Sequence, residues 1–112
     1  MNMHLLLVTF SLRNQDIDYS PFFVALRGNA LNWWHFIEQT CIVFTNRDAE
    51  QLTDLLLPYI HTNDSLLVAE IDAANCQGWL PLQAWDWIQE TSKQIRNEKL
   101  GKILAPPRQL PR

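Results

Sequence analysis

The sequence predicts a single α+β domain. The chain has 112 residues, a length that supports one hydrophobic core but not two. Hydrophobic residues make up 47% of the chain and charged residues 19%, as in ordinary globular proteins. Apolar and β-branched runs typical of strands alternate with two helical patterns in the order β-α-β-β-α-β. We therefore expect four strands and two helices around one core.

The first strand is expected over residues 5–12, because apolar side chains fill most of this run. Successive side chains of a strand point to opposite faces, so the even-numbered apolar residues face one way and Leu5 and Leu7 the other. Both faces of this strand therefore need a cover. The first helix should begin at Ser20 and Pro21, with the serine as its cap, and should end near residue 30.

A β-hairpin and a second helix follow. Residues 33–37 and 40–45 are aromatic and β-branched runs separated by two residues, which predicts a tight hairpin. Asn46 could cap the next helix, and Pro58 should kink or end it. Its apolar face comprises Leu52, Leu55, Leu56, Tyr59 and Ile60. The last strand is expected over residues 65–71.

This order of elements predicts the ferredoxin-like fold, an antiparallel sheet in the strand order 4-1-3-2 with both helices on one face. The opposite face carries Leu5 and Leu7 and would be bare without a cover. Two covers are available, a second subunit and the tryptophan-rich segment of residues 78–88. We expect both to contribute, with a homodimer as the commonest arrangement of subunits.

Charge divides the chain into an acidic domain, residues 1–92, and a basic tail, residues 93–112. The first part contains three basic and eleven acidic residues, for a formal net charge of −8, and the second six basic residues and one acidic one, for +5. The tail ends in a proline-rich stretch. Basic side chains can neutralise phosphates, so a contact with nucleic acid is expected first in the tail or in a groove built by a dimer. A solvated terminus is the alternative for the tail. The candidate residues are Lys93, Arg96, Lys99 and Lys102.

Cysteine usage and hydropathy suggest a cytoplasmic protein. Cys41 and Cys76 show neither CxxC spacing nor the density of a disulfide scaffold, so we expect two thiols. The apolar run of residues 5–10 lacks a basic leader and is far shorter than the roughly 20 residues of a membrane span. We expect neither a targeting segment nor a membrane partner.

Three stretches of the chain resemble the small bacterial proteins called the SinR family: residues 33–43, 66–71 and 78–88. These proteins are similar in turn to the small subunit of the CRISPR adaptation nuclease and to VapD toxins. The likeness spans roughly residues 4–88. It implies a ferredoxin-like dimer. In the nuclease relatives it also implies a metal ion held between two aspartates, one at the end of the first strand of each subunit.

The residue at the matching position of this chain is Ser11. A serine hydroxyl carries no charge, whereas a hard cation such as Mg²⁺ is held mainly by carboxylates and phosphate oxygens. The expected fold brings Asp16, Asp18, His61 and Asp64 to the same edge of the sheet. The aspartates could bind a metal and His61 could act as a general base, or all four could serve the turns in which they lie.

The first hypothesis is therefore a non-catalytic, lapsed nuclease-like protein that needs no cofactor and acts as a homodimer by binding a partner. A defence, mobile-element or toxin–antitoxin context is implied by the resemblance alone. One alternative is a Mg²⁺-dependent ribonuclease that uses Asp16, Asp18 or Asp64. Another is a scaffold that binds nucleic acid through its basic tail.

Overall fold

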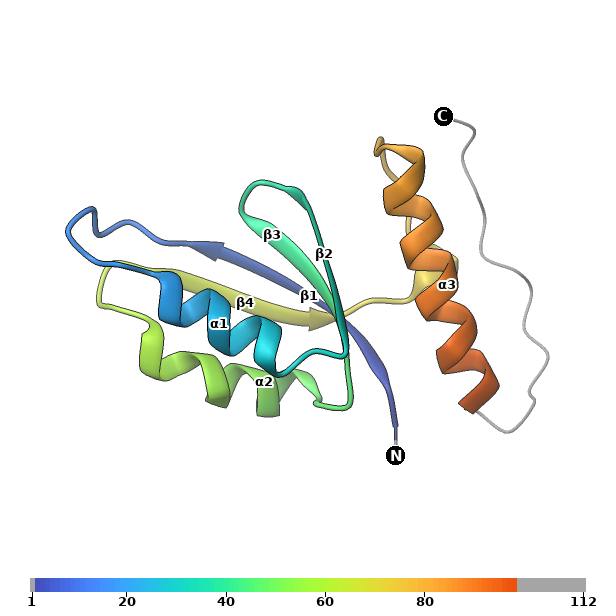
Figure 1. The fold of residues 1–112 in the computed structure, drawn as a ribbon, viewed down its shortest axis with the longest axis horizontal. Helices are drawn as coiled ribbons and strands as arrows, with labels where there is room; N and C mark the ends of the chain where they lie inside the picture. Colours follow the sequence, from blue (N-terminus) through green and yellow to red (C-terminus); the bar gives the residue numbers. More distant parts are fainter. Residues whose placement is uncertain (1, 99–112) are drawn as a thin grey trace.

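The computed structural model describes residues 2–98 and shows an α+β structure (Figure 1). Four antiparallel strands and three α-helices are present in this part of the chain. The elements are β1 (His4–Ser11), α1 (Ser20–Gly28), β2 (Asn32–Ile37), β3 (Thr40–Thr45), α2 (Ala49–Leu56), β4 (Ser65–Glu70) and α3 (Leu82–Glu98), with 3₁₀ turns at Leu57–Tyr59 and Ala73–Asn75. No helix within residues 2–98 is long and apolar enough to cross a membrane.

β1 is a central strand of the sheet, whose order is β2-β3-β1-β4. Read from the β4 edge, this is the order 4-1-3-2. β1 pairs antiparallel with β3 on one side and β4 on the other, and Val8 lies opposite both Cys41 and Val68. Helices α1 and α2 lie on the same face of the sheet (Figure 1). This arrangement is compatible with the ferredoxin-like fold that the sequence predicts.

The face of the sheet beneath α1 and α2 forms the first core cluster. Leu6, Val8 and Phe10 of β1 are buried there against Phe22 and Leu26 of α1 and the apolar side of α2. The rings of Phe10 and Phe22 meet edge to face, with 5.4 Å between their centroids. The predicted alternation of β1 is thus confirmed on this face.

The opposite face of the sheet is covered in part by α3. Leu5 is buried there in a second core cluster with Trp85 and Ile88 of α3. Figure 1 shows α3 beside the end of the sheet where β1 begins and β4 ends. The segment of residues 78–88 therefore supplies a cover as predicted, although Leu82 at the start of α3 remains 50% exposed. The helix continues past residue 92 to Glu98.

The predicted start of α1 is wrong by one residue. Ser20 is the first helical residue and Tyr19 occupies the cap position, without a capping hydrogen bond from its side chain. The backbone N–H of Ser20 donates to Asp18 Oδ1 over 2.9 Å, so a carboxylate outside the helix satisfies this donor. Pro21 lies in the first turn, where a proline costs no hydrogen bond.

The predicted cap of α2 is also wrong, because Asp48 and not Asn46 caps this helix. Asp48 Oδ1 accepts the backbone N–H of Gln51 over 2.8 Å, and Gln51 Oε1 accepts the N–H of Asp48 over 2.9 Å. This reciprocal pair is a capping box. At the other end, α2 stops at Leu56 and Pro58 lies in the 3₁₀ turn that follows, so the predicted effect of Pro58 is confirmed. The predicted helical positions of Tyr59 and Ile60 are wrong, because Tyr59 lies in this turn and Ile60 is extended.

The hairpin of β2 and β3 is confirmed with its two-residue connection, Glu38 and Gln39. Pairing is irregular between Trp34 and Ile37, where the register shifts. The carbonyl of Gln39 accepts the backbone N–H of Phe10 over 3.1 Å and so connects the hairpin to β1. The hairpin tip therefore lies next to the end of β1, as the predicted strand order requires.

Candidate functional site

The candidate site lies where β1 ends and β4 begins. Ser11 is paired with Ser65 across these two strands. The loop after β1 and the turn before β4 meet here, because the backbone N–H of Arg13 donates to Asp64 Oδ1 over 2.8 Å. The fold thus brings Ser11, Asp64 and the His61 turn to one edge, as the sequence predicts.

Asp64 is the centre of a hydrogen-bond network at this edge. The hydroxyl of Tyr19 lies 2.8 Å from Oδ1 and 2.7 Å from Oδ2 of this carboxylate. The backbone N–H of His61 donates to Oδ2 over 3.0 Å, and the side-chain amide of Asn14 to Oδ1 over 3.3 Å. Together with the N–H of Arg13, these donors join the loop to the turn.

The network favours the ionised form of Asp64. Desolvation raises the pKa of its carboxyl group, but the hydrogen bonds from Arg13, Tyr19 and His61 and the charge of His61 outweigh this effect. The net result is a pKa below the ordinary value of 3.8. Both carboxylate oxygens already accept hydrogen bonds from donors of the same chain, which supports the structural role in the turn as the alternative to metal binding by Asp64.

Ser11 faces a cation of its own chain. Arg13 Nε donates a hydrogen bond to Ser11 Oγ over 2.9 Å. The guanidinium group is therefore held at the place where the resemblance implies a metal-binding aspartate. A permanent positive charge at this distance opposes the binding of a second cation.

His61 packs its ring edge to face on Tyr19, with 5.9 Å between the two centroids. Its backbone N–H donates to the Asp64 carboxylate, and the charge of its imidazole lowers the pKa of that carboxyl group. The observed contacts therefore place His61 beside the network as a turn residue. The role of His61 as a general base stays a prediction.

The two other candidate aspartates, Asp16 and Asp18, lie in the loop between β1 and α1. Asp18 accepts the backbone N–H of Ser20, and hydrogen bonds from the side chain and backbone of Ser20 lower the pKa of its carboxyl group. Asp16 is exposed in the turn after β1. Among residues 2–98, no group of three or more His, Cys, Asp or Glu side chains is placed to hold a metal ion.

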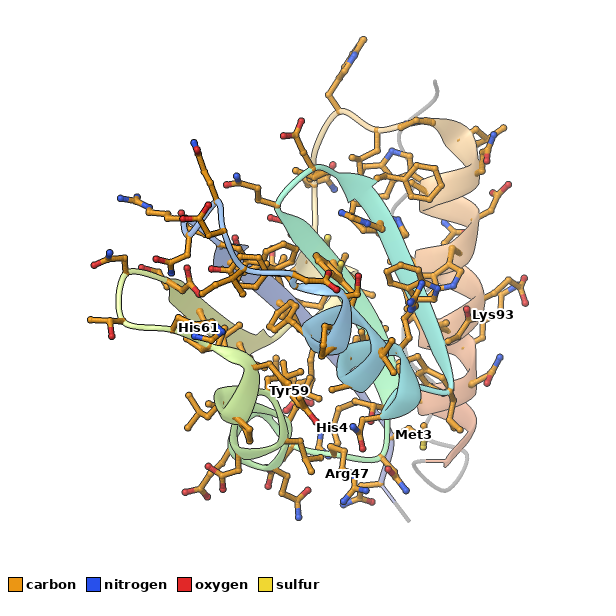
Figure 2. All side chains as sticks on the ribbon, turned by 60° about the vertical axis from the view of Figure 1, so that its left-hand side comes forward. Met3, His4, Arg47, Tyr59, His61 and Lys93 are labelled. Carbon is orange, nitrogen blue, oxygen red and sulfur yellow. The ribbon has the colours of Figure 1, made fainter. Side chains whose placement is uncertain are left out.

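Lys93, one of the four predicted basic residues, lies apart from this edge. Figure 2 shows Lys93 on α3 and His61 at opposite sides of the molecule. Lys93 Nζ lies 3.4 Å from Glu90 Oε1, an exposed pair within one helix turn. The side chain of Arg96, together with Lys99 and Lys102, lies outside the described residues. The structure therefore places one of the four candidates, at a distance from the acidic edge.

Sequence reasoning missed Tyr19, which donates to Asp64 from 45 positions away in the chain. It also missed a hollow of about 290 Å³ beside Ser11. The hollow is lined by Thr9, Phe10, Ser11, Gln39, Ser65, Leu66 and Leu67. The signal for it was the change from leucine to hydroxyl side chains along β1, which marks where the α3 cover stops.

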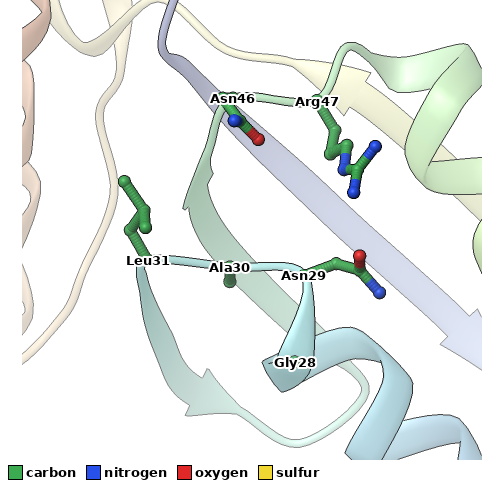
Figure 3. A pocket seen from close by; sticks show the side chains of 6 residues that line it. All are labelled: Gly28, Asn29, Ala30, Leu31, Asn46 and Arg47. Carbon is green, nitrogen blue, oxygen red and sulfur yellow. The ribbon is translucent and has the colours of Figure 1, made fainter.

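A second hollow lies between the end of α1 and the loop before α2 (Figure 3). It holds about 120 Å³, and the side chains of Asn29 and Arg47 approach it from these two loops. The hydroxyl of Thr45 donates to the carbonyl of Asn29 over 2.7 Å and accepts the N–H of Arg47 over 3.2 Å. These bonds fix the two loops against each other.

No family model matches the chain, and neither a curated protein nor a solved structure matches it with significance. The likeness to the SinR family, the CRISPR adaptation nuclease and VapD therefore stays a prediction from the sequence motifs.

Proposed function

We propose that this chain is a non-catalytic binding protein on a ferredoxin-like scaffold, a lapsed relative of the CRISPR adaptation nuclease and VapD proteins. The observation that carries the proposal is the hydrogen bond from Arg13 Nε to Ser11 Oγ. A guanidinium group stands where a nuclease of this kind would need a carboxylate and a divalent cation. The neighbouring carboxylate of Asp64 is held by hydrogen bonds within its own chain.

We further propose a homodimer, formed through the part of the sheet that α3 leaves uncovered. Leu7, on the face where the interface is expected, is half-buried and packed against the cluster beneath α3 of its own chain. Leu67 of β4, in contrast, is 60% exposed on the same face and lies opposite Thr9. It borders the hollow beside Ser11 and is the apolar residue best placed to contact a second subunit.

We place the protein in the cytoplasm. Cys41 and Cys76 are both free thiols, the state that a reducing compartment maintains. Burial raises the pKa of Cys41 to about 11, so this thiol is inert toward oxidation at neutral pH.

A nuclease assay tests the catalytic half of the proposal. Wild type, Asp16→Ala/Asp18→Ala and Ser11→Asp are incubated with labelled single-stranded RNA or double-stranded DNA in Mg²⁺, Mn²⁺ or EDTA. We expect no metal-dependent cleavage by wild type. Cleavage that requires the metal and disappears in the double variant would overturn the proposal in favour of the ribonuclease. Binding without cleavage that weakens steeply with salt would favour the nucleic-acid scaffold.

Sedimentation equilibrium tests the dimer. Leu67→Lys is compared with Val24→Lys, since Val24 on α1 is also 60% exposed and lies on the other side of the sheet. Lysine is well tolerated on edge strands, so the first variant should fold. We expect Leu67→Lys to shift the protein to monomer and Val24→Lys to leave the dimer intact. A monomeric wild type, or equal effects of the two variants, would show that this face is not the interface.

A further inference from the structure

An apolar groove lies in the loop that leads into α3. It holds about 620 Å³ and is lined by four consecutive residues, Trp79, Leu80, Pro81 and Leu82. Trp79 is 87% exposed and Leu82 50% exposed, so the groove offers an aromatic ring and an aliphatic wall to a ligand. Grooves of this composition suit proline-rich segments, whose rings pack on aromatic side chains.

We propose that this groove binds the proline-rich C-terminal segment of the same chain, residues 105–111. This segment contains three prolines and a leucine, and its only charged residue is Arg108. Its composition is thus the one that an aromatic and aliphatic groove accepts. Proline also lowers the entropy that a chain loses on docking, because its φ angle is already fixed.

The length of the chain fits this return path. From Leu82 to Glu98, α3 rises about 24 Å at ~1.5 Å per residue. Residues 99–106 span about 25 Å when extended at ~3.1 Å per residue. A tail that runs back along α3 therefore brings residue 106 level with the start of the helix, next to the groove.

Charge favours the same path. Residues 99–112 contain four basic residues and no acidic ones, whereas residues 1–92 carry a net charge of −8. Asp86 and Glu90 are exposed on α3 between its end and the groove. Lys102 comes level with Glu90 along the returning chain, about 12 Å from Glu98. Attraction between tail and helix thus guides the proline-rich segment toward Trp79.

Paramagnetic relaxation in the full-length chain tests the proposal. A nitroxide is attached to Gln109→Cys in a Cys76→Ser background, and Cys41 is left in place because it is fully buried. The probed signal is the indole N–H of Trp79, assigned by its absence from Trp79→Phe. We expect this signal to lose most of its intensity. The indole of Trp33, which lies 5.4 Å from the guanidinium of Arg27 on the α1 side of the sheet, should keep its intensity.

A Pro106→Ser/Pro107→Ser/Leu110→Ser variant with the same label should restore the Trp79 signal. Its changes lie outside the described fold, so the remaining resonances report whether the domain is intact. A mixture of ¹⁵N-labelled protein without nitroxide and nitroxide-labelled protein without ¹⁵N reports only contacts between different chains. It therefore distinguishes a segment of the same chain from a segment of a second copy. In this mixture the Trp79 signal should keep its intensity, and its loss there as well would assign the segment to a second copy and overturn the proposal. An unchanged Trp79 signal in every sample would overturn it as well.

Discussion

The hydroxyl of Tyr19 lies within 2.8 Å of both carboxylate oxygens of Asp64 and joins the loop after β1 to the turn before β4. Tyr19 also occupies the cap position of α1, so one residue positions the helix, the loop and the turn. We expect Tyr19→Phe to lower the midpoint of urea unfolding, because it leaves the carboxylate without its shortest hydrogen bond. Tyr59→Phe, at a tyrosine that is 37% exposed, is the matched control and should have a smaller effect. Equal midpoints for the two variants would contradict the role of Tyr19.

The stability that Asp64 contributes should depend on pH. Desolvation raises the pKa of its carboxyl group, yet the surrounding hydrogen bonds bring it below 3.8 in the folded state. A depressed pKa means that the unfolded chain binds the proton more tightly, so acid favours unfolding. The stability that ionised Asp64 contributes is fully present above the unfolded-state pKa of its carboxyl group. It is lost as the pH falls through the folded-state pKa.

Urea unfolding of wild type and Asp64→Asn at a series of pH values checks this sign. The difference in free energy of unfolding between them should be constant near neutrality and should shrink as the pH falls from the unfolded-state pKa through the lower folded-state pKa. Asp18 is present in both proteins, so its own lowered pKa cancels in the comparison. A difference that grows on acidification would show that the network does not stabilise the ionised form.

The capping box of α2 predicts a loss of stability when its acceptor is removed. Asp48→Ala should lower the free energy of unfolding by about 1 kcal/mol, since it removes the carboxylate that accepts the N–H of Gln51. Asp54→Ala changes an exposed residue within the same helix and serves as the control. Alanine is a good helix former, so this control should be neutral or slightly stabilising. Calorimetric or urea unfolding of both variants measures the difference.

The cover that α3 gives to the sheet predicts a large effect of Ile88→Ala. Ile88 is 1% exposed between α3 and the sheet, so the change removes buried methyl groups and should lower the free energy of unfolding by about 2–5 kcal/mol. Leu82→Ala at the exposed start of the same helix should change it far less. A small effect of Ile88→Ala would mean that α3 is not an integral part of the core.

The periodicity of β1 was sufficient to predict both of its faces. Leu6 and Val8 lie beneath α1 and α2, and Leu5 beneath α3, because strand side chains alternate whatever the neighbours are. The two helix caps were harder to predict. Ser20 and Asn46 are good capping residues by type, but the cap is set by where the backbone turns, and this depends on tertiary contacts.

The position of the candidate site in the fold could be predicted from the sequence, but its hydrogen bonds could not. Strand order alone places Ser11 near Asp64, since topology fixes which loops meet. The bond from Tyr19 to Asp64 joins residues distant in sequence and leaves no local pattern. The hydrogen bond from Arg13 to Ser11 could not be predicted from the sequence either. A serine and an arginine two positions apart are common in proteins and do not indicate a contact.

The half of the sheet that α3 leaves open is lined by hydroxyl groups. Thr40 donates to Thr9 over 3.2 Å, Thr9 donates to the Gln39 carbonyl over 3.2 Å, and Ser11 pairs with Ser65 on the adjoining strand. Such a surface is well hydrated in water. When these hydroxyl groups contact another molecule, they exchange hydrogen bonds with water for hydrogen bonds of similar strength, so the net gain in binding free energy is small. These hydroxyl groups therefore add little to the stability of the proposed dimer, which depends on the apolar contact of Leu67 on the same face.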